Sequence, residues 1–78
     1  MGDERYDGHR VVDANTGKIF FRVRGTRVVN ADTGELVFRI RDGRRVVDAD
    51  TGQLLFRIRA VGRLVDPDSS ELRYRLRP

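Results

Sequence analysis

The stretch Arg45-Val-Val-Asp-Ala-Asp-Thr-Gly-Gln-Leu-Leu-Phe-Arg-Ile-Arg59 occurs four times, with substitutions, along this chain of 78 residues. The four copies span residues 8–24, 25–42, 43–61 and 62–78, so the repeat period is 17 to 19 residues. A unit this short cannot bury its own apolar face, and such units are stable only when neighbouring copies cover one another. We therefore expect a single domain, residues 1–78, built from four equivalent parts.

Each copy contains two apolar strand patterns separated by a turn signal. In the first copy, residues 10–13 and 18–24 flank Ala14-Asn15-Thr16-Gly17, where Gly17 suits a left-handed backbone and Asp13 can accept hydrogen bonds from loop amides. Between the second and third copies, Asp42-Gly43 is typical of a two-residue hairpin turn. These signals predict an all-β fold, an antiparallel up-and-down meander of four β-hairpin repeats with about eight short strands.

An open sheet of this length would leave its apolar face in water, so it has to close, fold over or pair with another copy. A shallow barrel suits nearly identical hairpins best, and we predict that architecture. A sandwich, a fibre and a parallel solenoid with one copy in each coil are the alternatives. Because a domain of this size has no cysteine for a disulfide, we also expect a homo-oligomer.

The turns imply a pairing register. If Asp13 faces Lys18, a regular ladder places Val11 opposite Phe20 and Arg10 opposite Phe21, and a two-residue turn at Asp42-Gly43 places Phe38 opposite Val47. Side chains alternate across a strand, so this register predicts one core face: Val12, Ile19, Phe21, Val23, Val29, Leu36, Phe38, Ile40, Val47, Leu54, Phe56, Ile58, Val65, Leu72, Tyr74 and Leu76. The opposite face would carry a second apolar belt, either from ordinary β-propensity or as a surface for self-association: Val11, Phe20, Val28, Val37, Val46, Leu55 and Leu64.

The basic residues are almost all arginine. Fifteen of the sixteen are Arg and Lys18 is the only lysine, which reflects either codon usage or recognition of phosphate and carboxylate by planar guanidinium groups. The register pairs one arginine with one core ring in every copy, so these arginines either extend over the ring towards water or converge on one mouth of the barrel. The candidate anion-binding residues are Arg10, Arg27, Arg45 and Arg63, together with Arg24, Arg41 and Arg59 on the same rim.

Residues 46–59 resemble the hairpin repeats of tubby-like domains, including the LURP-one and phospholipid scramblase branches. They are closer still to the helix-free bacterial relatives described as β-flowers, and the resemblance covers residues 8–77. It implies a shallow barrel whose petals are hairpins, with lipid or anion binding as a second implication. The chain has no hydrophobic stretch for the central helix of tubby and no long basic loop.

Motifs for other functions are missing from the sequence. Asp48-Ala-Asp50-Thr-Gly52 resembles the start of a calcium loop, but the closing acid is replaced by Arg59. His9 has no nucleophile or acid at a recognisable spacing, and no phosphate-binding loop is present. We expect no enzymatic activity, no cofactor and no bound metal. Residues 1–5 do not resemble a signal peptide and no apolar run is long enough to span a membrane, so we expect a cytoplasmic protein.

Two functions remain open at this point. The first is a non-enzymatic binding and assembly module that engages an anionic partner, a lipid headgroup or a nucleic-acid backbone, through its arginine-rich rim. The second is a purely structural protein that associates with itself, as an oligomer or a trimeric fibre, through the apolar belt or through contact of an acidic rim with a basic one. If the charges separate between the two rims, the net charge of +4 understates the electrostatic field at each rim.

Overall fold

The computed structural model describes residues 5–59 and 62–78 and contains eight strands joined into one closed antiparallel barrel. The strands are β1 (Arg10–Asp13), β2 (Ile19–Arg24), β3 (Arg27–Asn30), β4 (Leu36–Arg41), β5 (Arg45–Asp48), β6 (Leu54–Arg59), β7 (Arg63–Val65) and β8 (Leu72–Arg77). Each strand pairs with its neighbours in sequence, and β1 pairs with β8 to close the barrel. The predicted meander, the strand number and the barrel are confirmed. The predicted boundary between the third and fourth repeats, at residue 61, lies outside the described residues, as do residues 1–4.

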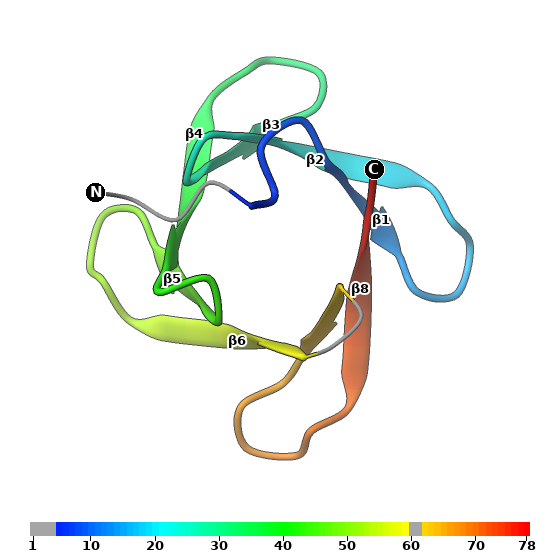
Figure 1. The fold of residues 1–78 in the computed structure, drawn as a ribbon, viewed down its shortest axis with the longest axis vertical. Helices are drawn as coiled ribbons and strands as arrows, with labels where there is room; N and C mark the ends of the chain where they lie inside the picture. Colours follow the sequence, from blue (N-terminus) through cyan, green and yellow to red (C-terminus); the bar gives the residue numbers. More distant parts are fainter. Residues whose placement is uncertain (1–4, 60–61) are drawn as a thin grey trace.

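The four loops within the hairpins lie at one end of the barrel and project outward from its wall (Figure 1). Their geometry repeats from copy to copy. In the first loop the Oδ1 atom of Asp13 accepts hydrogen bonds from the amides of Asn15 (2.7 Å) and Thr16 (3.0 Å), and Gly17 has φ +78°. Asn30, Asp48 and Asp66 accept the same two bonds in the other loops. The sequence prediction for these turns is confirmed.

A β-bulge in every hairpin corrects the predicted register. Val12 lies opposite Ile19 as expected, but Val11 lies opposite Phe21 and Arg10 lies opposite Arg22, so Phe20 is an extra residue in β2. Val37, Leu55 and Arg73 are the extra residues in the other hairpins. Neighbouring loops stabilise three of the bulges, because the carbonyls of Phe20, Val37 and Arg73 accept hydrogen bonds from the amides of Ala31, Ala49 and Ala14.

The connection between β4 and β5 also differs from the prediction. Arg41 lies opposite Arg45, so the turn contains three residues, Asp42, Gly43 and Arg44, and not the two residues Asp42 and Gly43. Phe38 therefore lies opposite Asp48, and the predicted pairing of Phe38 with Val47 is wrong. The first connection, from Arg24 to Arg27, does have two residues.

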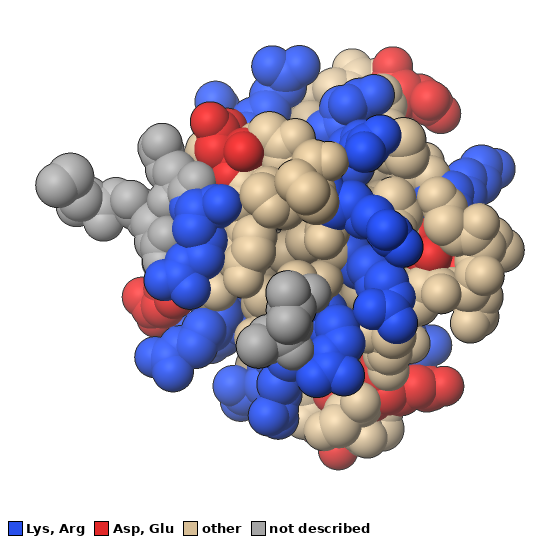
Figure 2. Space-filling view, turned by 45° about the vertical axis from the view of Figure 1, so that its right-hand side comes forward, with Lys and Arg blue, Asp and Glu red and all other residues tan. Residues whose placement is uncertain are grey.

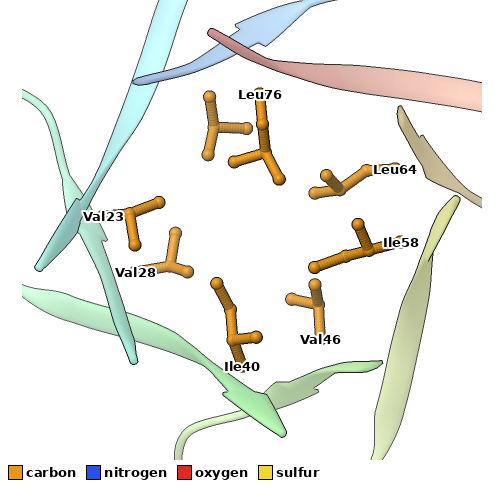
Figure 3. Close-up of a cluster of buried hydrophobic side chains, with 8 residues drawn as sticks. Val23, Val28, Ile40, Val46, Ile58, Leu64 and Leu76 are labelled. Atoms are coloured by element: carbon orange, nitrogen blue, oxygen red, sulfur yellow. The ribbon is translucent and has the colours of Figure 1, made fainter. Parts of the chain in front are cut away.

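The bulges decide which valine of each short strand faces the core. Each bulge shifts the alternation by one residue, so the core takes the first apolar residue of each short strand (Figure 3). The buried cluster contains Val11, Val23, Val28, Ile40, Val46, Ile58, Leu64 and Leu76, with Tyr6, Phe21, Phe38, Phe56 and Tyr74 packed against it. On the long strands the prediction is right for Phe21, Val23 and their equivalents, but Ile19, Leu36, Leu54 and Leu72 lie opposite Val12, Val29, Val47 and Val65 and outside this cluster. On the short strands the prediction is wrong, because Val11, Val28, Val46 and Leu64 of the expected outer belt lie inside the barrel.

The second valine of each short strand is buried on the outer side of the sheet. Val29, for example, is only 7% exposed and lies between Arg22 of β2 and Leu36 of β4. The same arrangement surrounds Val12, Val47 and Val65. Long arginine stems cover apolar surface while their charged ends stay in water, so each outer valine gains cover from an arginine on the neighbouring strand.

Four aromatic rings close one layer of the core. Phe21, Phe38, Phe56 and Tyr74 pack edge to face in a cycle, with centroid distances of 5.2, 6.0, 5.6 and 6.0 Å around it. One ring comes from each hairpin, so the cycle follows the fourfold repeat.

Near the opposite end, the amide of Gly8 donates to the carbonyl of Val23, and Tyr6 packs against the core. The described residues contain no helix that could span a membrane.

Candidate functional site: a belt of arginines

Every pair of adjacent strands carries one arginine directly opposite another. The eight pairs are Arg10 with Arg22, Arg10 with Arg77, Arg24 with Arg27, Arg27 with Arg39, Arg41 with Arg45, Arg45 with Arg57, Arg59 with Arg63, and Arg63 with Arg75. They form four rows of three, each centred on a short strand. Twelve of the fifteen arginines belong to these rows, which we call the arginine belt.

The belt lies on the outer wall of the barrel. Arg10 precedes the core residue Val11, and Arg22 lies between the inward-facing Phe21 and Val23, so alternation points both guanidinium groups outward. Arg39 and Arg75 are half-buried and the other ten are exposed. Figure 2 shows basic side chains in a band down the visible face, with acidic side chains mostly towards its edges.

This position corrects one part of the site prediction. The predicted register pairs Arg10 with Phe21, and the three equivalent arginines with Phe38, Phe56 and Tyr74, so that they either extend over the rings or converge on one mouth of the barrel. The bulge places Arg22 opposite Arg10 instead, and the same shift occurs in every hairpin. The four arginines sit at the centres of the four rows on the outer wall, and Arg24, Arg41 and Arg59 flank three of them.

Five belt residues were not among the predicted site residues: Arg22, Arg39, Arg57, Arg75 and Arg77. A signal for them is present in the sequence, because each long strand ends in the pattern Arg-x-Arg at residues 22–24, 39–41, 57–59 and 75–77. Spacing by two residues puts both side chains on one face of a strand. The two arginines of each long strand therefore link one row of the belt to the next.

Like charges directly opposite one another destabilise a sheet, by roughly 0.2 to 1 kcal/mol for each pair. Few carboxylates offset this cost in the described part of the chain. Arg45 forms an ion pair with Asp42 at 2.5 Å, and the guanidinium group of Arg10 donates to the carbonyl of Pro78 at 3.1 Å. Apart from Arg45 and Arg63, no belt arginine lies within ion-pair distance of a described Asp or Glu side chain.

The third repeat has one further arginine next to the belt. Arg44, in the three-residue turn, occupies the position held by His9, Thr26 and Gly62 in the other repeats. A shallow hollow of about 300 Å³ is lined by Asp42, Arg44, Arg45 and Arg57. A second hollow, of about 290 Å³, is lined by Arg44, Arg57, Ile58 and Arg59. Each hollow is large enough for a phosphate group.

Apart from Asp7 and Asp42, the described acidic residues occupy the loops at the other end of the barrel. Backbone hydrogen bonds from Thr16 and then Asn15 lower the pKa of Asp13 below its usual value, and those from Asp68 and Ser69 do the same for Asp66. The carboxylates of Asp13 and Asp66 therefore interact mainly with amides of their own loops. In the described residues, no three His, Cys, Asp or Glu side chains come together as metal ligands would.

The twelve guanidinium groups could hold several phosphate or carboxylate groups at once, at intervals set by the sheet. Comparison of the chain with protein-family models, with curated proteins and with solved structures gives no match.

Proposed function

We propose that this protein is a non-enzymatic binding module that engages a phosphate-bearing polyanion through its arginine belt. The observation that carries the proposal is the presence of an Arg–Arg pair in all eight strand pairs. Each pair costs stability in the free protein. A multivalent anion that bridges paired guanidinium groups would remove the repulsion and form charge-assisted hydrogen bonds.

Thermal unfolding with tripolyphosphate tests the proposal. Ligand binding stabilises the folded state, by about 2.7 kcal/mol at a hundredfold excess over Kd. We expect tripolyphosphate to raise the melting temperature well beyond the rise caused by sodium chloride at the same ionic strength, since chloride only screens the charges. If both salts act alike, the proposal is wrong.

A pair of variants locates the effect. Arg27→Gln with Arg45→Gln removes two row centres and should remove most of the shift specific to tripolyphosphate. Arg5→Gln with Arg73→Gln makes the same charge change outside the belt and should leave that shift largely intact. Equal losses in the two variants would mean that net charge, and not the belt, governs binding.

Self-association is the second candidate, and the separation of charge favours it. The exposed acids Asp32, Glu35, Asp50, Asp68 and Glu71 lie in the outward loops, at the opposite end from the turns that join the repeats. Contact between these loops and the belt of another molecule would be an ordinary electrostatic pairing. A sedimentation experiment at low and high salt tests it, since such an assembly should dissociate as salt rises.

A further inference from the structure

The belt has no gap. Strand closure joins Arg10 of β1 to Arg77 of β8 on one side and to Arg22 of β2 on the other. On each long strand, two arginines separated by one residue connect consecutive rows. A path from one guanidinium group to the next therefore runs around the whole barrel and returns to its start.

This closed path restricts the shape of a ligand that can use all of it. The molecule measures only 27 × 23 × 21 Å. A bilayer is flat, and duplex DNA has a persistence length of roughly 50 nm, so either would touch one arc of the belt. A flexible single chain can bend around the barrel and meet every row.

The use of arginine indicates the chemistry of this flexible ligand. All twelve belt positions are arginine, although the compact ammonium group of lysine also binds phosphate. The planar guanidinium group additionally stacks on nucleobases, which single-strand-binding proteins use alongside phosphate contacts. Inorganic polyphosphate offers nothing to stack on.

We infer that the ligand of the belt is single-stranded nucleic acid that wraps around the barrel, with its phosphates bound by belt arginines and its bases stacked on guanidinium planes. This inference rests on the proposed function and goes further, because it names the ligand class and its path. Binding would be largely independent of base sequence, since backbone charge and base faces are common to all sequences.

Fluorescence anisotropy with labelled oligothymidylates of about 4 to 24 nucleotides tests the path, since single-strand domains occupy roughly 4 to 16 nucleotides. Each phosphate contact to a single strand contributes roughly 0.7 to the slope of log K against log salt. An oligonucleotide that contacts all twelve belt arginines should give a slope of about −8, and one that contacts only the three arginines of one row should give about −2. We expect the slope to steepen with length and then reach a plateau in a one-to-one complex. A slope independent of length would overturn wrapping.

Variants on opposite sides of the barrel sharpen the test. Arg27→Gln with Arg39→Gln changes β3 and β4, and Arg63→Gln with Arg75→Gln changes the diametrically placed β7 and β8. With a long oligonucleotide, each pair should make the slope shallower by about 1.4, and the combined variant by about twice that. Loss confined to one pair would indicate binding on a single arc. Unchanged circular dichroism spectra serve as the control for folding.

A last comparison separates nucleic acid from other phosphate chains. The combined variant Arg27→Lys, Arg39→Lys, Arg63→Lys and Arg75→Lys keeps the charge but loses the planar surface, so it should weaken the binding of oligothymidylate severalfold more than the binding of polyphosphate of equal length. If the variant loses affinity for both polymers by the same factor, or if a duplex binds more tightly than a single strand, the nucleic-acid inference is wrong. If no phosphate polymer binds in a salt-dependent way, the proposed function itself fails.

Discussion

Phe21 packs edge to face against Phe38, with ring centroids 5.2 Å apart and ring planes at 70°. Both side chains come from equivalent positions in consecutive repeats, and Phe56 and Tyr74 complete the cycle. Each ring is half-buried and lies against the aliphatic cluster. The aromatic cycle therefore joins all four hairpins in one packed layer.

Removal of one ring should destabilise the whole barrel. We expect Phe38→Ala to cost about 3 kcal/mol, the lower end of the range for Phe→Ala because the ring is half-buried. Val37→Thr, at the neighbouring bulge position, should cost far less. Phe38→Leu should recover much of the loss, leaving about 1 kcal/mol for the lost ring contacts. Urea unfolding measures all three, and equal losses at positions 37 and 38 would contradict this core.

The fourth loop contains a correctable strain. Ser70 has φ +63° at the position where the other loops have Gly17, Gly34 and Gly52, each at +78°. We expect Ser70→Gly to stabilise the protein by about 1 kcal/mol, because a left-handed backbone costs a residue with a Cβ about that much. The reverse change, Gly52→Ser, should destabilise the protein by a similar amount through its left-handed backbone. A steric clash should not add to this cost, because a Cβ at Gly52 would meet nothing within 4 Å. Thermal unfolding of both variants tests the pair, and a destabilised Ser70→Gly protein would refute it.

Gly62 should tolerate alanine less well than Gly8. Both have positive φ, but a Cβ at Gly62 would lie 3.0 Å from the carbonyl oxygen of Leu76, whereas at Gly8 it would meet nothing within 4 Å. The Gly62 carbonyl also accepts a hydrogen bond from the Leu76 amide. We expect Gly62→Ala to lower the melting temperature clearly more than Gly8→Ala. Similar effects of the two changes would mean that backbone conformation alone matters at residue 62.

The free energy of unfolding should fall at low pH, because the loop aspartates become protonated. Because loop amides lower the pKa of Asp13 in the folded state, its ionised form stabilises the fold above the unfolded value of about 3.9. That contribution is lost as pH falls from there through the lower folded pKa. Asp13→Asn should remove this pH dependence and keep the loop, since Asn30 accepts the same two amide bonds in the second repeat. Unfolding of both proteins from neutral pH to below pH 3 tests this, and parallel curves would contradict it.

Relief of one Arg–Arg pair should stabilise the free protein. Arg27 lies between Arg24 and Arg39, so Arg27→Glu replaces two repulsive pairs with attractive ones and should add about 1 kcal/mol at low salt. Arg27→Gln removes only the repulsion and should add less. Both gains should shrink as salt screens the charges. Denaturation at two salt concentrations measures them, and a destabilising Arg27→Gln would show that the arginine stem over the outer wall matters more than its charge.

The amino-acid sequence determined the local structure. The four-residue loops ending in a left-handed residue, the short and long strands and the meander all follow from turn chemistry and a repeated pattern, because these depend on contacts between residues close in the chain. Closure into a barrel followed as well, since nearly identical hairpins would otherwise leave one face in water. The abundance of arginine on one rim was also visible.

The tertiary structure alone decided which residues face inward and where the arginines meet. A short strand such as Arg45-Val-Val-Asp48 offers two adjacent valines, and alternation by itself cannot choose between them. The bulge at Leu55 makes the choice, and barrel neighbours support such bulges through hydrogen bonds such as that from Ala49 to Val37. The same one-residue shift moves Arg45 from Phe56 to Arg57. The pairing of the arginines therefore depends on the bulges within the hairpins and on the closure of β1 against β8, which the Arg-x-Arg pattern alone does not specify.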